Sequence, residues 1–597
     1  MRYWYLVLGG ITLTAGVLLG LAPWEGRSPK PPPADGRDDP PAEEYSLVAT
    51  PGVPWFEDVT RAAGIDFQHN GDATPRHLIQ ETIGSGLGWI DYNRDGWPDL
   101  FCVQVASSGS ASPAKAQPTH RLFENQGDGT FRDVSAQAGV ALSGYGMGVE
   151  VGDFDNDGFD DLLLSEIGRV VLLHNQAGSE GKRRFVDVTA RAGLANRHWG
   201  TSCAWGDVDG DGWLDLYIAN YVEIDPARPL VCRDHASQKP QSCTPTAYPH
   251  THHRLFRNRR DGTFEDISER AGITRAPPAP GLGVVMADLD SDGLIDIYVA
   301  NDMKPAYLFQ NLGQGRFVEK ALEAGCALGR NGNSMAGMGV ALGDLDGTGR
   351  PSLFVTNFQH EPNVLFLNRG QMHFDEQSHP SGLGLPSLAR LGFGTVALDA
   401  DREGRLDLAV VNGHVNRHAQ VISRAPFTQE GQLFLGLGGG KFREVSRQAG
   451  AYFHQRHVGR GLAVADYDRD GRPDLAVSNN GGPVLLLRNR TENTHRGLTL
   501  TLQGDGVKSN RNAIGARVEV QTTQGKQTYW IHGGGSYLSS SDRTLHVGLG
   551  SEPQTRAVRV RWPSGHFQEF GALEADQAYR LVEGKARAES VPPPPIR

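Results

Sequence analysis

The chain has 597 residues, with 58 Lys and Arg against 69 Asp and Glu, and a formal net charge of −11 at pH 7. This length allows several domains and an ample hydrophobic core. The acidic balance, with no basic stripe along the sequence, argues against a nucleic acid as partner.

The first segment is apolar. Residues 1–22 (MRYWYLVLGGITLTAGVLLGLA) contain a single Arg in a hydrophobic run whose length suits either a membrane-spanning helix or a long signal peptide. Ala22 precedes Pro23, which is a poor place to cleave, and we favour an uncleaved anchor that faces outward over a cleaved leader that leaves a secreted or periplasmic protein. Residues 23–54 are rich in Pro and acids and are expected to form a disordered linker.

A short acidic loop then recurs seven times, with starts 54 to 81 residues apart. Its positions 1, 3 and 5 carry carboxylates or an amide, position 6 is Gly, and position 9 is Asp in six of the seven copies. Calcium takes six to eight oxygen ligands, and alternate residues of a tight turn direct theirs at one point. Plain Asp- and Gly-rich turns would not require the Asp at position 9, so the pattern predicts several Ca²⁺ sites, structural rather than catalytic.

Five of the loops are intact, with Asp or Asn at positions 1, 3 and 5 and Asp at position 9. These ligands are Asp91, Asn93, Asp95 and Asp99; Asp153, Asp155, Asp157 and Asp161; Asp207, Asp209, Asp211 and Asp215; Asp288, Asp290, Asp292 and Asp296; and Asp466, Asp468, Asp470 and Asp474.

Two further loops depart from the pattern. The loop of Asp399, Asp401, Glu403 and Asp407 has a longer Glu at position 5, which puts its geometry in question. The loop beginning at Asp344 has Thr348 and Ser352 where carboxylates are expected, so we predict weak binding or none.

Each loop belongs to a unit with four short β-rich runs, as in the third unit: the segment before the acids, DLYIAN (215–220), LFRN (255–258) and FEDIS (264–268). Four strands per repeat at this period predict an all-β fold with a seven-bladed β-propeller. The first strand-four segment, Phe56–Thr60, precedes every acidic loop, and none follows the last. It is therefore expected to complete the blade of residues 460–489 and to remove an open sheet edge.

After strand four, Ser or Thr is followed by a short segment that ends in Ala-Gly, as in Ser135–Gly139, Thr189–Gly193 and Ser268–Gly272. This pattern predicts one capped helical turn ended by Gly.

Beyond the repeats, apolar patterns predict strands at 498–503, 514–520, 526–532, 544–549 and 557–562. We therefore predict a separate small β domain over residues 491–586, after a propeller of residues 55–490, and a disordered tail at 587–597.

The repeats resemble the FG-GAP/VCBS blades of integrin α-chains and of many secreted bacterial proteins. The segments NRNAIGARVEV (510–520), GGGSYLSSSDRTLHVGLG (533–550) and VRVRWPSG (558–565) resemble the ASPIC/UnbV domain. A propeller followed by this domain is the layout of the cartilage acidic protein family, and the resemblance covers about residues 55–585.

The chain has five Cys. Cys232 and Cys243 flank a polar excursion and suit a local disulfide in an oxidising compartment, and the family resemblance implies a Cys pair at this place. Cys102, Cys203 and Cys326 lie in or beside apolar strands and are expected to be small core residues.

We expect an exported calcium-binding module that binds a protein or glycan at the cell exterior, with no catalytic or cofactor-binding residues. Two alternatives stay open. One is a calcium-dependent polysaccharide-active enzyme of lyase type. The other is an accessory protein in natural-product biosynthesis, which the resemblance implies because UnbV-like proteins are associated with natural-product clusters.

The partner is expected on the face opposite the calcium loops, because connections in an antiparallel blade alternate between the two strand ends. The long connections at 105–121, 221–253 and 413–432 lie at the other end, and long loops on a rigid scaffold commonly bind. His250–His253, Tyr248 and Asp234 are the expected contacts. The alternative that His250, His252 and His253 bind a transition metal is less favoured than exposed loop histidines.

Overall fold

The computed structural model describes residues 55–106, 117–178 and 181–592, all of which belong to one compact unit. The predicted anchor or leader (1–22) and the linker (23–54) lie outside the described residues. Within the described residues, no helix has both the length and the apolar character needed to cross a bilayer.

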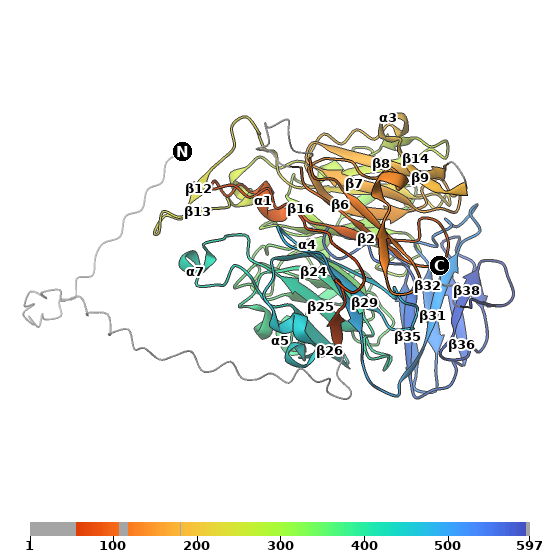
Figure 1. The fold of residues 1–597 in the computed structure, drawn as a ribbon. Helices are drawn as coiled ribbons and strands as arrows, with labels where there is room; N and C mark the ends of the chain where they lie inside the picture. The colour runs from red at the N-terminus through yellow and green to blue at the C-terminus, as the bar shows by residue number, and fades with distance from the viewer. Residues whose placement is uncertain (1–54, 107–116, 179–180, 593–597) are drawn as a thin grey trace, which may run out of the picture. The chain divides into compact units, whose positions relative to one another are not determined.

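The fold is all-β and propeller-like, and Figure 1 shows it as a ribbon. The described residues form seven antiparallel sheets of four repeat strands each, and every sheet includes one of the acidic loops between its first two strands. In chain order the strands are β2 Leu87–Ile90, β3 Asp99–Cys102, β4 Arg121–Asn125, β5 Phe131–Asp133; β6 Gly146–Gly152, β7 Asp161–Glu166, β8 Arg169–Ala177, β9 Arg183–Asp187; β10 Gly200–Gly206, β11 Asp215–Asn220, β14 Arg254–Asn258, β15 Phe264–Asp266; β16 Gly281–Ala287, β17 Asp296–Asn301, β18 Tyr307–Asn311, β19 Phe317–Glu319; β20 Val340–Gly343, β21 Ser352–Val355, β22 Val364–Gly370, β23 His373–Glu376; β24 Gly392–Leu398, β25 Asp407–Asn412, β26 Gln432–Gly438, β27 Lys441–Glu444; and β28 Gly459–Ala465, β29 Asp474–Asn479, β30 Leu485–Asn489 with β1 Phe56–Asp58.

The pairing of the first repeat strand with the last sheet is confirmed. β1 runs antiparallel to β30, with Phe56 opposite Asn489 and Asp58 opposite Leu487. The sheet order β1–β30–β29–β28 therefore joins residues more than 400 positions apart and leaves β30 with no open edge.

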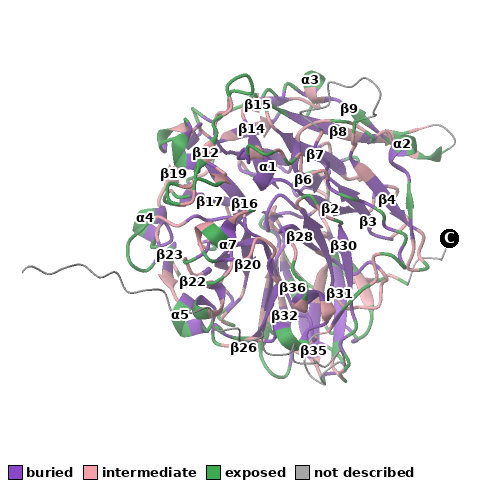
Figure 2. Ribbon diagram, turned by 60° about the vertical axis from the view of Figure 1, so that its left-hand side comes forward, coloured by how far each residue is buried: buried purple, intermediate pink, exposed green. Residues whose placement is uncertain are grey.

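Burial falls from the innermost to the outermost strand of each sheet (Figure 2). Every residue of β6, β10 and β16 is buried, whereas β5 and β1 bury only their first residue. The innermost strands are thus covered on both faces, which explains why their sequences are apolar and Gly-rich rather than alternating.

The short turns after the outermost strands differ from the expected capped helices. α2 (Ser135–Ala138) and α3 (Thr189–Ala192) do end at Gly residues with positive φ, but the side chains that accept from their first N–H groups are Asp133 and Asp187 (2.9 Å each), not the Ser and Thr hydroxyls. The hydroxyls instead accept hydrogen bonds from the third strand, from Leu122 N to Ser135 Oγ (2.9 Å) and from Leu172 N to Thr189 Oγ1 (2.8 Å). The predicted N-cap role was wrong, because the tertiary partner outcompetes the local one.

The remaining helices are single turns in loops. They are α1 Gln80–Ile83, α4 Ala321–Ala324, α5 Ser378–Ser381, α6 Gly384–Ser387 and α7 Ala419–Ile422, with 3-10 turns at Pro245–Ala247, Ile273–Arg275, Ser446–Gln448 and Ala451–His454.

The C-terminal residues form two four-stranded sheets, in the orders β35–β31–β38–β39 and β33–β32–β36–β37. The five predicted strands correspond to β31 Arg496–Gln503, β32 Arg517–Gln521, β33 Lys526–Trp530, β35 Leu545–Gly550 and β36 Ala557–Arg561, and the structure adds β34 Gly533–Gly534, β37 Phe567–Glu569, β38 Ala578–Val582 and β39 Glu589–Ser590. The tail expected from residue 587 is thus ordered at β39, which pairs with β38, and residues 593–597 lie outside the described part.

One C-terminal segment enters the propeller-like sheets. β34 is a fifth strand beside β16, and the residues after it touch the innermost strands of the other sheets. Trp89 N and Val149 N donate hydrogen bonds to Ser540 O and Leu538 O, and Leu538 N donates to Ser202 Oγ. Ser536 donates from its N to Val340 O and from its Oγ to Leu462 O. The Tyr537 ring packs against the Phe393 ring. Residues 533–540 therefore lie where the seven innermost strands converge.

This approach requires glycine. A Cβ on Gly533 would lie 1.8 Å from Trp205 O, and one on Gly534, where φ is +67°, would lie 2.4 Å from Val284 O. The C-terminal sheets also share a hydrophobic core with the second and third propeller-like sheets, since Leu163, Leu172 and Trp205 pack in one cluster with Leu500 and Trp562.

Candidate calcium sites

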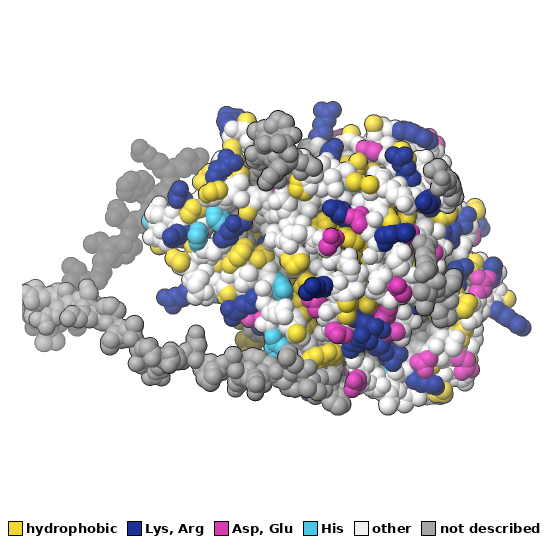
Figure 3. Space-filling model, viewed as in Figure 1, with side chains coloured by type: hydrophobic (Ala, Val, Ile, Leu, Met, Phe, Trp, Pro, Cys, Tyr) yellow, Lys and Arg dark blue, Asp and Glu magenta, His cyan; other side chains and the backbone are white. Residues whose placement is uncertain are grey.

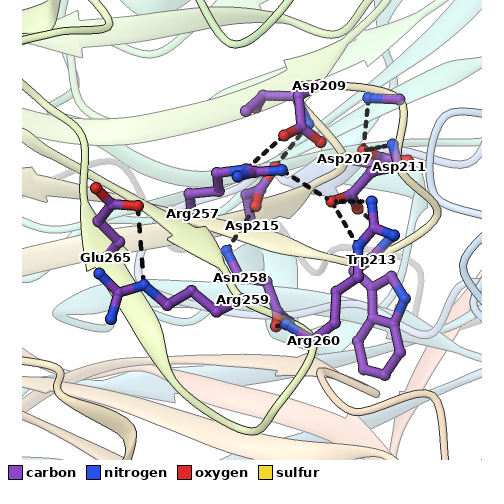
Figure 4. A network of polar contacts seen from close by, with 12 residues as sticks. Asp207, Asp209, Asp211, Trp213, Asp215, Arg257, Asn258, Arg259, Arg260 and Glu265 are labelled. Carbon is purple, nitrogen blue, oxygen red and sulfur yellow. Dashed lines mark hydrogen bonds and ion pairs between the residues drawn. The ribbon is translucent and has the colours of Figure 1, made fainter.

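The loop beginning at Asp207 shows how the sequence pattern folds (Figure 4). Asp207, at position 1, accepts hydrogen bonds from Asp211 N (3.0 Å) and Gly212 N (2.7 Å). Asp215, at position 9, accepts them from Val208 N (2.9 Å) and Asn258 N (2.8 Å). These backbone bonds wrap the loop around its own carboxylates and fix their directions.

The same bonds recur around the other loops. The position 1 carboxylate accepts from the Gly at position 6 in all seven loops, at 2.7 to 2.9 Å. Each of these glycines has a positive φ, from 77° to 99°, which a side chain would disfavour. Gly therefore occurs at position 6 of every loop because the backbone there has a positive φ.

The carboxylates of positions 1, 3 and 9 converge. In the loops beginning at Asp153, Asp207, Asp288 and Asp399, one oxygen from each of the three residues lies within 4.8 Å of the others. The loop beginning at Asp399 is one of these, so the Glu at position 5 does not disturb the convergence of positions 1, 3 and 9.

Several carboxylate oxygens in the loops are buried without a hydrogen bond. Asp209 Oδ1, Asp288 Oδ1, Asp468 Oδ1 and Glu403 Oε1 are examples. Buried polar atoms are nearly always satisfied, so such oxygens call for a further partner. An oxygen-only donor set of this kind fits a hard cation such as Ca²⁺.

The electrostatics of the loops point the same way. Burial, and then repulsion from neighbouring carboxylates, raises the pKa of Asp91 to about 7 and of Asp153 to about 8. Burial also raises the pKa of Asp207 to about 6, and it holds that of Asp215 well above its usual range. These shifts report acids that lack compensating charge.

The loop beginning at Asp344 keeps its shape without the missing carboxylates. Thr348 Oγ1 donates to Asp346 Oδ1 (2.7 Å), and Ser352 Oγ accepts from Asn368 N (3.1 Å) where the other loops use Asp. The substitutions therefore preserve the turn and remove two anionic ligands, and weak cation binding here stays a prediction.

In six of the seven sheets, an Asn at the end of the third strand connects the acidic loop to the loop of the preceding sheet. Asn175 Nδ2 donates to Asp160 O (3.0 Å) in its own loop and to Tyr92 O (2.8 Å) in the loop before it. Six of the seven sheets have this pair of bonds, through Asn125, Asn175, Asn258, Asn311, Asn368 and Asn489. In the sequence these residues are the last letter of motifs such as LFRN, but their role was not predicted.

On the connections between second and third strands, Cys232 and Cys243 form the expected disulfide, and Cys102, Cys203 and Cys326 are buried free thiols as predicted. The prediction that the nearby histidines are exposed was wrong for His253, which is 3% exposed and accepts a hydrogen bond from Asn220 N (3.0 Å). Tyr248 is also buried, and burial raises its pKa to about 12. These two side chains pack under the long connection rather than on its surface.

Comparison with protein-family models agrees with this architecture. FG-GAP-like repeat models match residues 91–164, 247–299 and 288–355, an FG-GAP repeat model matches 458–494, and the ASPIC and UnbV model matches 506–588. The chain is an FG-GAP repeat protein with a C-terminal ASPIC and UnbV domain.

The chain is homologous to cartilage acidic protein 1. It is 25% identical to the Mus musculus protein over 448 residues, which cover 71% of this chain and 62% of that protein, and 25% identical to the Homo sapiens protein over 446 residues, covering 71% and 60%. The match thus spans about three fifths of these relatives' length.

Among solved structures, an Agrocybe aegerita lectin that recognises non-reducing terminal N-acetylglucosamine is 15% identical, with a TM-score of 0.37 over 68% of this chain and 95% of the lectin. A Bacillus licheniformis rhamnogalacturonan lyase is 13% identical, with a TM-score of 0.29 over 71% and 78%.

In this FG-GAP repeat protein, the C-terminal domain contacts the acidic loops directly. Arg561 Nη1 lies 3.1 Å from Asp288 Oδ2, and Asn512 bridges Asp153 N (2.7 Å) and Asp160 Oδ1 (2.8 Å). His495 Nδ1 lies 2.8 Å from Asp401 O. Sequence reasoning missed these contacts, which join residues at least 90 positions apart and leave no local pattern.

Proposed function

We propose that this protein is an exported, calcium-stabilised module that binds a protein or glycan without catalysing a reaction. The observation that carries the calcium part is the repeated convergence of three carboxylate oxygens within 4.8 Å in four loops. Together with buried oxygens that accept no hydrogen bond, this geometry supports Ca²⁺ at the loops beginning at residues 153, 207 and 288. We propose Ca²⁺ at the loops beginning at residues 91 and 466 as well, because they carry the same ligand spacing. The convergent loop beginning at Asp399 is a sixth candidate.

Bound Ca²⁺ would supply positive charge where burial has concentrated acids, and so would stabilise the native fold. The residues at positions 1, 3, 5 and 9 would hold the ion, with the backbone bonds of the loop already orienting them. The disulfide between Cys232 and Cys243 supports an oxidising, exported location.

We also propose that the seven sheets are the blades of one closed propeller. The innermost strands are neighbours in succession, and β28 of the last sheet is a neighbour of β2 in the first. The Asn bonds support the same ring, because Asn125 Nδ2 in the first sheet donates to Tyr467 O in the last (2.8 Å).

The partner is proposed to bind on the face opposite the acidic loops. The C-terminal domain contacts the loops, whereas the hairpin of β12 (Cys232–Arg233) and β13 (Pro240–Gln241) and α7 belong to the long connections, which lie on the left in Figure 1. Beside the hairpin, Leu230 and Val231 are 45% and 47% exposed. A cavity of ≈450 Å³ lined by Ile224, Leu230 and Tyr248, among others, opens next to them.

The charges on the face of the molecule seen in Figure 3 are mixed. Figure 3 shows Lys and Arg interspersed with Asp and Glu on the visible face, with no large area of one sign. This distribution supports a protein or glycan partner over a nucleic acid.

A glycan array and a panel of cell-surface ectodomains, each probed in Ca²⁺ and in chelator, test the proposal. Replacing residues 232–243 by a tight turn should abolish binding and leave the calcium-dependent melting temperature nearly unchanged. Binding that survives the first deletion and fails on loss of Asp209 and Asp211 would place the partner on the loop face, and unsaturated products released from polysaccharides would favour the lyase alternative.

A further inference from the structure

Arg460 is a buried arginine at the strand end away from an acidic loop. It is the second residue of β28, whose other end leads into the loop beginning at Asp466, and its side chain is fully buried. The second residues of β6, β16 and β24 are the apolar Met147, Leu282 and Phe393. The last sheet therefore places a cation where these comparable strands place hydrophobic side chains.

Backbone carbonyls of neighbouring sheets hold the guanidinium. Its Nε donates to Thr82 O (2.8 Å), ahead of β2, and its Nη1 donates to Gly413 O (3.0 Å), just after β25, and to Gly459 O (2.8 Å). Its Cζ lies 3.9 Å from the centroid of the Phe393 ring. These contacts fix the guanidinium between the sixth, the last and the first sheets.

The remaining nitrogen has no acceptor. Arg460 Nη2 is buried without a hydrogen bond, and no carboxylate of the described residues forms an ion pair with the guanidinium. Burial lowers the pKa of Arg460 to about 10, so the group is still charged at pH 7. A buried charge is strongly unfavourable unless it is paired, and buried donors are nearly always satisfied. Both rules call for a negatively charged acceptor at Nη2.

Two histidines within the field of this charge present further donors. Gly481 N donates to His69 Nδ1 (3.1 Å), and Asn416 N donates to His414 Nδ1 (2.9 Å). A neutral imidazole that accepts at Nδ1 carries its proton on Nε2, and both Nε2 atoms are buried without a partner. Burial, and then the charge of Arg460, lowers the pKa of His69 to about 3 and that of His414 to about 4. Both rings are therefore neutral donors near pH 7.

We propose that Arg460 Nη2 binds a small monovalent anion such as chloride, with the Nε2–H groups of His69 and His414 as further donors. His414 follows Gly413, whose carbonyl accepts from the same guanidinium. The unpartnered groups are all donors, so they fit an anion and not a metal cation. One negative charge balances the one guanidinium, whereas a divalent anion would leave an excess charge buried. The inference is independent of the proposed function, because the site involves none of the calcium ligands.

Bromide is the probe for the site in the crystal. Crystals of the full chain, grown in Ca²⁺ and soaked in sodium bromide, should show an anomalous difference peak beside Arg460 Nη2. An adventitious ion only, with peaks elsewhere and none at this nitrogen, overturns the inference.

In solution, chloride replaces gluconate at constant ionic strength and in saturating calcium gluconate, so that binding is separated from screening. Above the dissociation constant, each tenfold rise in chloride should raise the folded-to-unfolded ratio of the wild type about tenfold in urea unfolding. Arg460→Met, which introduces the side chain found at Met147, should remove this response. Arg456→Met, at a side chain that is 58% exposed, is the matched control and should keep it.

A chloride response that persists in Arg460→Met refutes the site. If that variant does not fold, the bromide peak of the wild type decides the question alone. The response of the melting temperature to Ca²⁺ tests the proposed function separately, and its outcome leaves the chloride result unaffected.

Discussion

Replacing Tyr537 tests whether the C-terminal segment that enters the propeller-like sheets is part of the folded core. The side chain is fully buried, its hydroxyl donates to Ile83 O (2.9 Å), and its ring meets Phe393 edge-on with centroids 5.0 Å apart. The Tyr537→Phe variant loses the hydroxyl and leaves a buried carbonyl unsatisfied, which costs about 1–3 kcal/mol. Tyr537→Ala also opens a cavity, and large aromatic truncations in cores cost about 3–5 kcal/mol, so the total with the lost hydrogen bond is about 4–8 kcal/mol.

The measurement is urea unfolding of the full chain in saturating Ca²⁺, followed by intrinsic fluorescence. Phe567→Ala, at an aromatic side chain of the same domain that is 72% exposed, is the control and should change stability by less than about 0.5 kcal/mol. A Tyr537→Ala variant within 1 kcal/mol of wild type would mean that the segment is not integral to the fold, and the reasoning would be refuted.

Three further predictions concern the loops. In chelator, the free energy of unfolding should fall as pH rises from about 4 to 8. The pKa values of Asp91 (about 7) and Asp153 (about 8) are raised in the folded state. Over this range the folded state therefore holds protons that the unfolded state has released. Ca²⁺ at pH 7.5 should restore it, and a chelated protein whose melting temperature rises over this range would contradict the argument. Asn175→Ala leaves Tyr92 O and Asp160 O without their donor, so it should lower the free energy of unfolding in urea by about 2–4 kcal/mol. Asn333→Ala, at an exposed side chain, is the control and should leave the free energy of unfolding unchanged. Arg257→Gln removes a guanidinium that contacts Asp209 and Asp211 and competes with a cation for them. Calorimetry should therefore show tighter Ca²⁺ binding at this loop. Unchanged or weaker binding would argue that the arginine supports the ion.

Local features were predictable from the sequence. The acidic loops could be located because their ligand spacing and the Gly at position 6 are set within nine residues, and the structure gives that Gly a positive φ in every loop. The pairing of β1 with β30 was also predictable, since an unpaired strand-four segment at one end of the repeats and a missing one at the other leave a single way to complete the last sheet.

Other features depended on tertiary contacts that no local pattern encodes. The Gly-rich run at 533–535 has no apolar period, yet Gly533 and Gly534 lie against β10 and β16, because only a backbone without side chains can approach Trp205 O and Val284 O so closely. The burial of His253 and the direction of His174 toward Asp155 likewise depend on strands that are distant in sequence. The repeat, its strands and its acidic ligands follow from the sequence alone. Which side chains from other strands and from the C-terminal domain surround those ligands depends on the folded chain, because these contacts form by packing between segments that share no sequence period.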